Sequence, residues 1–276
     1  MTFRISKDTA LCMSLSARPG NFGTRFHNFL YEELKLDFVY KAFTTRDLKA
    51  AIGGIRALGI RGCAVSMPFK EACIEFLDEL DPTASAISSV NTIVNTDGHL
   101  KAYNTDYVAV SRLLAAHGVA PDSTFALRGS GGMAKAVAHA MREAGFRSGH
   151  ILARNSSTGQ ALARSCGFEW RAELGGLRPE LLINVTPIGM RGGAEAEELA
   201  FDVDAIDSAR TVFDVVAVPP ETPLVRAARA RGKAVIPGAE VIRLQAVEQF
   251  VLYTGVRPNQ DQVERAAAFA LAEPAR

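Results

Sequence analysis

Short apolar runs alternate with longer segments of helical period along most of this chain. The alternation predicts strands at residues 10–15, 37–42 and 62–66, and helices at 24–34, 46–58 and 70–80. The helix at 70–80 is indicated by Cys73, Phe76, Leu77 and Leu80, which would bury one face. This alternation of strand and helix is typical of α/β proteins with a mainly parallel sheet.

Two local signals depart from the alternation before residue 110. Asp81 followed by Pro82 predicts a short helix, with the aspartate as its cap and the proline at its first position. Thr96-Asp97-Gly98 separates two runs of alternating polar and apolar residues, which predicts a β-hairpin. We expect this hairpin to end the first strand–helix unit.

The alternation resumes after a helix at 107–117 and the turn residues Gly118 and Pro121. It predicts strands at 123–127, 150–153, 181–184, 211–215 and 233–236, and helices at 133–143, 157–166 and 224–231. The acidic, glycine-containing segment 191–200 is predicted to be an exposed loop. The chain from Gly238 onward is predicted to be helical, with a last helix from about Asn259.

Length and composition fit this organisation and exclude several classes of protein. A chain of 276 residues with 48% hydrophobic and 22% charged residues is an ordinary globular protein, long enough for two domains. Its 31 basic residues are balanced by 30 acidic ones without a basic run, so we expect no nucleic-acid partner. The sequence has no apolar run of about eighteen residues and no apolar core of a signal peptide near its start, so we expect a cytoplasmic protein with no membrane partner.

The four cysteines and five histidines are scattered along the chain. No Cys-x-x-Cys pair or histidine cluster is present, so we expect no metal site and reduced, buried thiols.

A glycine-rich turn follows the predicted strand at 123–127. Gly129-Ser130-Gly131-Gly132 precedes Met133 at the start of a helix, the context in which free N–H groups and a close backbone approach hold a pyrophosphate. The next strand is followed by Arg154 and Asn155 rather than by an acid that would bind the ribose hydroxyls, which favours NADP over NAD. A plain strand-to-helix turn and a solvated arginine are the alternative interpretation.

Lys70 and Asp106 are the candidate acid–base residues. Lys70 follows the apolar run at 62–66, and Asp106 ends the polar segment that contains Asn104 and Thr105. A lysine beside a nicotinamide can supply the proton that a carbonyl needs on reduction, and a carboxylate can orient it. Either residue alone is as readily a surface charge.

Several motifs along nearly the whole chain resemble those of the shikimate dehydrogenase family. The segment Ala64-Val65-Ser66-Met67-Pro68-Phe69-Lys70 is similar to the family's Asn-Val-Thr-x-Pro-x-Lys, and Tyr103 to Asp106 match its Tyr-Asn-Thr-Asp. In the family order there follow counterparts of its remaining motifs: Asn91 in DELDPTASAISSVNT, Gly129 to Gly132, Ala153-Arg154-Asn155, Asn184 to Met190, and Gln245.

The resemblance implies a reversible, NADP-dependent reduction of 3-dehydroshikimate to shikimate in aromatic amino acid biosynthesis. It implies an N-terminal α/β substrate domain, residues 1–106 completed by helices in 239–276, and a Rossmann-type NADP-binding domain, residues 107–238. The protein would be a monomer or a homodimer. Lys70 would carry the catalytic proton with Asp106 as its partner, and the substrate, a cyclic hydroxy acid, would contact Ser14, Ser16, Ser66, Asn91 and Gln245. The cofactor would contact Gly129, Ser130, Gly131, Gly132, Met133, Arg154, Asn155, Thr186 and Gly238.

Three departures from the family pattern predict a divergent branch. Residues 17–26 intervene between Ser16 and His27-Asn28, which predicts a longer loop on the substrate side. Ala217 replaces a substrate-binding tyrosine, and Ala153 replaces an asparagine next to the cofactor arginine. Because a site that loses a substrate hydrogen bond loses much of its rate, shikimate itself can be a slow substrate. Arg18 or Arg25 is a candidate replacement for the tyrosine as a carboxylate ligand.

Two functions remain open from the sequence. The first is an NADP-dependent alcohol dehydrogenase acting on shikimate, quinate or an analogue, which the presence of Lys70 and Asp106 favours. The second is a non-catalytic NADP(H)-binding regulatory protein on the same fold, since fold alone does not determine activity.

Overall fold

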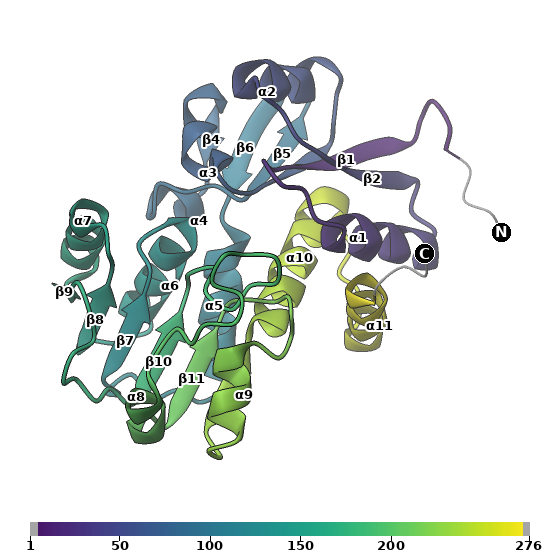
Figure 1. The fold of residues 1–276 in the computed structure, drawn as a ribbon. Coiled ribbons are helices and arrows are strands. Elements are labelled where there is room, and N and C mark those ends of the chain that lie inside the picture. Colours follow the sequence, from purple (N-terminus) through teal and green to yellow (C-terminus); the bar gives the residue numbers. More distant parts are fainter. Residues whose placement is uncertain (1–4, 273–276) are drawn as a thin grey trace. The chain divides into compact units, whose positions relative to one another are not determined.

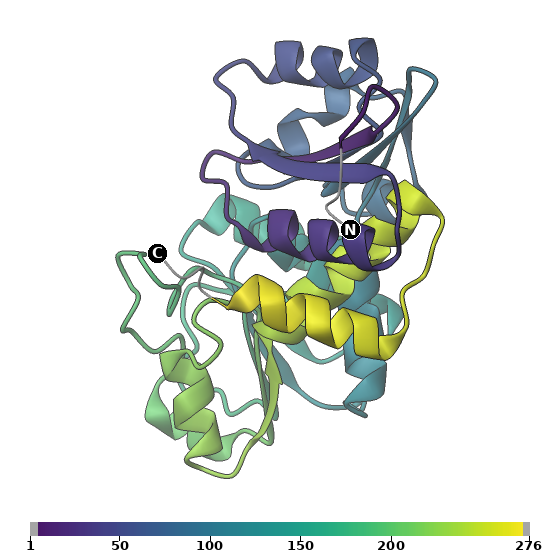
Figure 2. The ribbon, with the colours of Figure 1, turned by 90° about the vertical axis from the view of Figure 1, so that its right-hand side faces the viewer.

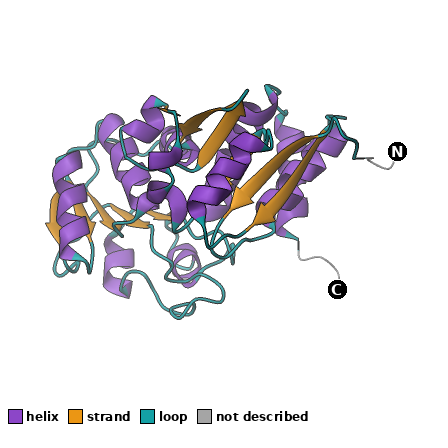
Figure 3. Cartoon of the chain, turned by 90° about the horizontal axis from the view of Figure 1, so that it is seen from above, coloured by secondary structure: helices purple, strands orange, loops and turns teal. Residues whose placement is uncertain are grey.

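The computed structural model describes residues 5–272, which form two compact units (Figure 1). Unit 1 comprises the residues up to Thr105 and those from Arg243 onward, and unit 2 comprises Asp106–Ile242. Helices α5 (Thr105–Ala116) and α10 (Gly238–Thr254) begin in one unit and continue into the other. In each unit the strands lie between helices (Figure 3).

Unit 1 is built on one mixed six-stranded sheet of order β2-β1-β3-β5-β6-β4. Its strands are β1 (Ala10–Leu15), β2 (Phe38–Phe43), β3 (Gly62–Val65), β4 (Glu79–Leu80), β5 (Thr92–Thr96) and β6 (His99–Tyr103). Its helices are α1 (Phe22–Glu33), α2 (Leu48–Ala57), α3 (Phe69–Ala72), α4 (Pro82–Ser85) and α11 (Gln260–Leu271), with a 3-10 turn η1 (Ile74–Phe76). The pairs β1–β2, β1–β3 and β4–β6 are parallel, whereas β3–β5 and β5–β6 are antiparallel.

Two apolar clusters cover the sheet of unit 1. Helices α1 and α11 lie side by side (Figure 2), and together with α10 they bury the large side chains of Phe26, Leu30, Tyr31, Phe250 and Tyr253. The other cluster contains Ile52 and Ile55 of α2. The C-terminal helices thus complete the core of the N-terminal sheet, as the sequence predicted.

Unit 2 contains an entirely parallel six-stranded sheet of order β12-β11-β10-β7-β8-β9. Its strands are β7 (Phe125–Arg128), β8 (Gly149–Leu152), β9 (Glu169–Arg171), β10 (Leu181–Asn184), β11 (Thr211–Asp214) and β12 (Ala234–Pro237). Its helices include α6 (Gly132–Glu143), α7 (Ser156–Cys166), α8 (Val203–Ser208) and α9 (Pro223–Arg229). Counted from β7, this is the Rossmann strand order, whose switch point lies between β7 and β10.

The segment after Lys70 differs from the sequence prediction. A single helix over 70–80 is wrong, because the chain forms α3, then η1, then strand β4, which pairs with β6. Hydrogen bonds to β6 replace helical ones here: the N–H of Asp78 donates to the Leu100 carbonyl (3.1 Å) and that of Asp81 to the Ala102 carbonyl (2.8 Å). The apolar side chains at helical spacing still pack on the core. The spacing predicted their burial but not their secondary structure.

Local turn chemistry was predicted correctly. The Asp81 carboxylate accepts from the N–H of Thr83 (3.0 Å) at the start of α4. Asp97 and Gly98 both have positive φ, 52° and 88°, at the turn between β5 and β6, as a tight hairpin turn requires. The short strand β9 and helix α8 were not predicted, although Asp202 caps α8 by accepting from the N–H of Ala205 (2.7 Å).

Residues 17–26 do not form one long loop. Helix α1 begins at Phe22, so the second half of the inserted segment is helical. The guanidinium of Arg25 donates to the Phe269 carbonyl (2.6 and 3.1 Å) and lies over the Phe269 ring. Arg25 therefore ties α1 to α11, which leaves Arg18 as the candidate carboxylate ligand from this segment.

Candidate functional site

The predicted hydroxyl residues of unit 1 lie at the carboxyl ends of two adjacent strands. Ser14 lies in β1 and Ser16 directly follows it, and Ser66 follows β3, the parallel neighbour of β1. The N–H of Ser66 donates to the Leu15 carbonyl (2.9 Å), and the Ser16 hydroxyl lies 3.5 Å from the Met67 carbonyl. Sheet pairing thus brings the three serines to one edge, where ligands of α/β proteins bind.

Asn91 lies at the same edge, because it directly precedes β5, which runs antiparallel to β3. Its carbonyl accepts from the N–H of Val65 (2.8 Å), at the end of β3. Its side chain donates to the Thr105 hydroxyl (3.0 Å) and accepts from the Thr105 N–H (2.8 Å). Since Asn91 is 3% exposed, these bonds fix its amide in one orientation.

Lys70 is held at the same place through its backbone. It lies in the single turn of α3, its carbonyl accepts from the N–H of Val90 (2.8 Å), and its side chain is half-buried. Val90 directly precedes Asn91, so the main chain of Lys70 is connected to the Asn91 segment. Lys70 and Asn91, both candidate site residues, therefore lie close together along the backbone of unit 1.

Asp106 begins unit 2 and is 4% exposed, in the first turn of α5. It directly follows Thr105, the residue whose backbone N–H and side-chain hydroxyl bond to Asn91. A carboxylate in the first turn of a helix is favoured by the partial positive charge of that end.

Helix α10 contributes two glutamines one turn apart. The amide of Gln249 donates to the Asn91 carbonyl (3.2 Å) and to the Thr92 hydroxyl (3.1 Å), and Gln249 is 4% exposed. Gln245 precedes it by four residues and so shares its helix face. Gln245 was predicted from the sequence as a substrate ligand, whereas Gln249 was not, although its four-residue spacing from Gln245 is visible in the sequence.

The glycine-rich turn of unit 2 lies at the switch point of its sheet. A Cβ on Gly129 would lie 2.7 Å from Val185 Cγ2, and its φ of +132° also requires glycine. A Cβ on Gly131 would meet nothing within 4 Å, so open space lies beside Gly131, which directly follows Ser130 and precedes Gly132 and Met133 at the start of α6. A free helix start next to open space fits a pyrophosphate.

The residues after β8 fit the nucleotide end of a cofactor. Asn155 caps α7 by accepting from the N–H of Thr158 (3.2 Å), and the Thr158 and Ser130 hydroxyls lie 2.8 Å apart, which connects this cap to the glycine-rich turn. Arg154 is exposed, with 76% of its side chain accessible. The turn, the cap and the cation together could hold a phosphorylated dinucleotide.

The alanine at position 153 has a structural explanation. The indole N–H of Trp170 donates to the Ala153 carbonyl (3.2 Å). A Cβ on Gly159 would lie 2.5 Å from the Trp170 ring and 2.8 Å from Ala153 Cβ, so the ring fills the space between these small residues. The larger family asparagine would have less room here.

Thr186 and Gly238 lie at the carboxyl ends of the remaining strands. The Asn184 side-chain oxygen accepts from the N–H (3.1 Å) and hydroxyl (2.6 Å) of Thr186. Gly238 follows β12, and a Cβ there would come within 2.4 Å of the Val216 backbone. These residues and the glycine-rich turn therefore share one edge of the parallel sheet.

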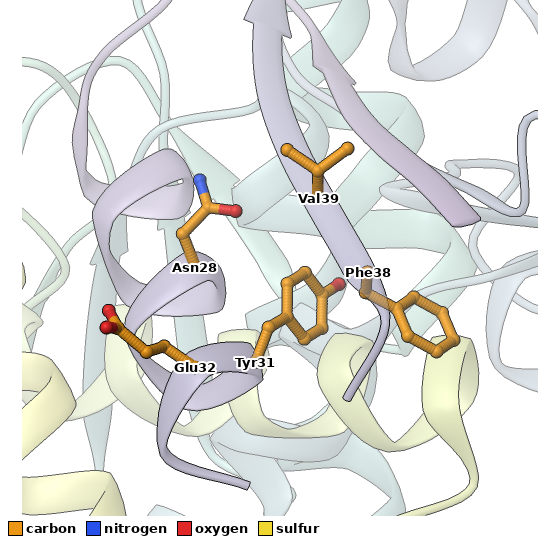
Figure 4. Close-up of a pocket in the computed structure, with 5 residues that line it drawn as sticks. All are labelled: Asn28, Tyr31, Glu32, Phe38 and Val39. Atoms are coloured by element: carbon orange, nitrogen blue, oxygen red, sulfur yellow. The ribbon is translucent and has the colours of Figure 1, made fainter. Parts of the chain in front are cut away.

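A separate pocket of about 180 Å³ lies on unit 1 (Figure 4). Asn28, Tyr31 and Glu32 of α1 and Phe38 and Val39 of β2 line it, and none of them is a predicted site residue. The Asn28 side-chain amide donates to the Tyr40 carbonyl and accepts from the Tyr40 N–H, both at 2.8 Å. Its polar groups are therefore used in hydrogen bonds to the backbone of β2. The residues that line this pocket therefore differ from those of the candidate site around Lys70.

No group of three or more potential metal-ligating side chains occurs within residues 5–272. None of the helices described for this chain is long and apolar enough to span a membrane. The four cysteines are free and buried, as expected.

Comparison with known proteins identifies relatives along almost the whole chain. The family model of the shikimate dehydrogenase substrate binding domain matches residues 22–93. A "shikimate dehydrogenase-like protein" of Haemophilus influenzae is 57% identical over 266 residues, covering 96% of this chain and 98% of the relative. A "shikimate dehydrogenase (NADP(+))" of Moorella thermoacetica is 37% identical, covering 83% of this chain and 82% of the relative.

Solved structures agree with the sequence comparison. Shikimate 5-dehydrogenase from Thermus thermophilus in complex with NADP(H) and shikimate superposes with a TM-score of 0.85 at 29% identity, covering 95% of this chain and 100% of that one. The two-domain α/β fold with a Rossmann-type unit, predicted from the sequence, is thereby confirmed.

Proposed function

This chain belongs to the shikimate dehydrogenase family, and we propose that it is an NADP-dependent oxidoreductase acting on a cyclic polyhydroxy acid. The reaction is the reversible transfer of hydride between NADP(H) and the acid, with 3-dehydroshikimate and shikimate or a related pair as substrates. The observation that carries the proposal is the buried network around Asn91, which connects the backbone of Lys70 to Thr105, the residue before Asp106.

The polar groups of unit 1 support a hydroxylated, acidic substrate. Three serine hydroxyls and the Asn91 amide gather at one strand edge, and Gln245 lies on the helix face that Gln249 holds against Asn91. Hydroxyls and amides both donate and accept, as ring hydroxyls require. We assign the carboxylate to Ser14 and Ser16, and the ring hydroxyls to Ser66, Asn91 and Gln245.

When bound, NADPH would supply the hydride that reduces the substrate's carbonyl carbon. The carbonyl oxygen then gains negative charge, and the ammonium group of Lys70 donates a proton to it, which yields the alcohol and a neutral amine. In the reverse direction the neutral Lys70 amine takes the hydroxyl proton as hydride leaves the carbon. Asp106 orients the ammonium group and binds a neighbouring substrate hydroxyl.

Unit 2 would hold the cofactor through three features. The free N–H groups at the start of α6, after Gly131, bind the pyrophosphate. The Arg154 guanidinium pairs with the 2′-phosphate, a group that guanidinium binds through two donors. Asn155, Thr186 and Gly238 shape the rest of this edge.

The proposal is tested by mixing the protein with NADP and either shikimate or quinate and measuring the NADPH formed by its near-ultraviolet absorbance. We expect turnover in the unaltered protein and a loss of about 10²-fold or more in Lys70→Ala and Asp106→Asn. Lys49→Ala removes an exposed lysine of α2 and serves as the matched control. Turnover that survives in Lys70→Ala would overturn the assignment of the proton carrier.

Binding is measured separately from turnover. The single tryptophan, Trp170, donates to the carbonyl of Ala153, the residue before Arg154, so its fluorescence should report nucleotide binding. The non-catalytic alternative predicts NADP binding with no turnover of any cyclic hydroxy acid. Ala217, which is half-buried after β11 where the family has tyrosine, is the feature that keeps this alternative open.

A further inference from the structure

Arg154 has an acidic partner within unit 2. Its guanidinium lies 3.4 Å from the carboxylate of Glu195, which belongs to the acidic segment 191–200. The Arg154 side chain is 76% exposed and that of Glu195 is 27% exposed. The cation assigned to the 2′-phosphate is thus already paired with an anion in the free protein.

The Glu195 carboxylate belongs to a loop whose backbone makes several hydrogen bonds. The Glu195 carbonyl accepts from the N–H of Gly189 (2.9 Å), and the Met190 carbonyl accepts from that of Gly193 (3.0 Å). The N–H of Arg191 donates to the Val218 carbonyl (2.9 Å), in the segment between β11 and α9. Gly189 has a φ of +84° and little space for a Cβ, which would lie 3.3 Å from Pro223. Backbone hydrogen bonds therefore hold the loop at Glu195, and Arg154 is the more exposed partner of the pair.

We infer that the Glu195 carboxylate competes with the 2′-phosphate for Arg154 and so reduces the preference of this protein for NADP over NAD. The inference rests on the proposed function, in which Arg154 receives that phosphate. Carboxylate and phosphate bind a guanidinium through the same donors, so the phosphate must displace Glu195 or share the cation with it. NAD lacks the phosphate and leaves the pair intact. Glu195 therefore lowers the affinity for NADP and leaves that for NAD nearly unchanged.

The expected effect is moderate, because an exposed ion pair is weak. Its removal should strengthen NADP binding by about three- to fivefold. The same carboxylate also repels a nearby phosphate, which acts in the same direction and weakens as salt screens it. The effect of the substitution should therefore shrink at high ionic strength.

Calorimetric titration of the whole chain tests the inference without turnover. The probes are adenosine 2′,5′-bisphosphate and 5′-AMP, which differ only in the 2′-phosphate, followed by NADP and NAD. Glu195→Gln keeps the shape of the side chain and removes its charge. Glu197→Gln makes the same change at an exposed position of the same loop, where no ion pair is found within the described part of the chain. Arg154→Ala tests the cofactor assignment itself.

We expect Glu195→Gln to bind the bisphosphate and NADP three- to fivefold more tightly than the unaltered protein, with 5′-AMP and NAD unchanged and Glu197→Gln nearly without effect. Equal gains in Glu195→Gln and Glu197→Gln, or no gain in either, would overturn the role of Glu195. If Arg154→Ala binds the bisphosphate as well as the unaltered protein does, the proposed NADP site fails instead. Thermal unfolding of each variant checks that the fold is retained.

Discussion

The side-chain amide of Asn184 donates to the carboxylate of Asp214 across 3.0 Å, and both residues are completely buried at the ends of β10 and β11. The second Asp214 oxygen accepts from the Thr222 hydroxyl (2.6 Å). On its other side, the Asn184 oxygen accepts from Thr186. A buried carboxylate thus fixes the amide that positions Thr186 at the proposed cofactor edge.

This carboxylate makes the stability of unit 2 depend on pH. Burial raises the pKa of Asp214 from 3.8 to about 6, although bonds from Thr222, Val216 and Asn184 act in the opposite direction. Between about pH 4 and 6 the folded state therefore binds more protons than the unfolded state, and the free energy of unfolding falls by about 3 kcal/mol as pH rises. Asp214→Asn should remove this fall in urea titrations. Asp204→Asn, on the surface of α8, should keep it; equal slopes in both variants would contradict the prediction.

His27 in unit 1 should produce the opposite dependence. Its ring is completely buried and stacks on Tyr40 with centroids 4.5 Å apart, and Gln249 is the polar side chain that acts on it against the effect of burial. Burial lowers the pKa of His27 from 6.5 to about 3, so the ring is neutral in the folded state.

Because the unfolded chain takes up a proton at His27 first, the free energy of unfolding should fall by about 3 kcal/mol from about pH 7 to about pH 4.5. His27→Phe keeps a stacked ring and should remove that loss in urea titrations at the two pH values. His99→Phe, at an exposed position of β6, is the control. An unchanged acid sensitivity of His27→Phe would show that His27 is not its source.

Gly129 and Gly131 should respond differently to alanine. Gly129→Ala brings a Cβ within 2.7 Å of Val185 at a φ of +132°, so we expect the free energy of unfolding to fall by about 1–3 kcal/mol. Gly131→Ala meets nothing within 4 Å and should change stability by less than about 0.5 kcal/mol. Its methyl group would nevertheless occupy the proposed pyrophosphate space, so NADP binding, followed by Trp170 fluorescence, should weaken at least about tenfold. Unimpaired binding by Gly131→Ala would argue against a pyrophosphate there.

Gln249 should act as a positioning residue for Asn91. Gln249→Met keeps the length of the side chain and removes both donors, so the Thr92 hydroxyl loses a buried partner. We expect a loss of about 1–3 kcal/mol in stability and a larger change in KM for the cyclic acid than in kcat. Gln260→Met, at the exposed start of α11, is the matched control. If only stability changes, Gln249 has a structural role alone.

Much of the fold could be read from the sequence because the relevant forces act locally. Strand β1 has the predicted bounds, the Asp97-Gly98 turn adopts positive φ, and Asn155 and Asn259 cap the helices that follow them. The glycine-rich turn was also readable, since its conformation depends on missing side chains. The helix over 70–80 was wrong because its backbone bonds to β6, a partner that helical spacing does not reveal.

The sequence by itself determined the alternation of elements, the turns and caps, and the residue types of the proposed site. Only the tertiary structure decided which of those residues meet. Arg154 and Glu195 are 41 positions apart, Asn184 and Asp214 are 30 apart, and Asn91 and Gln249 are 158 apart. Hydrophobic period and turn chemistry act over a few residues, whereas these pairs form only when strand order brings distant segments to one sheet edge. The proposed specificity of the site therefore depends on contacts that no local pattern contains.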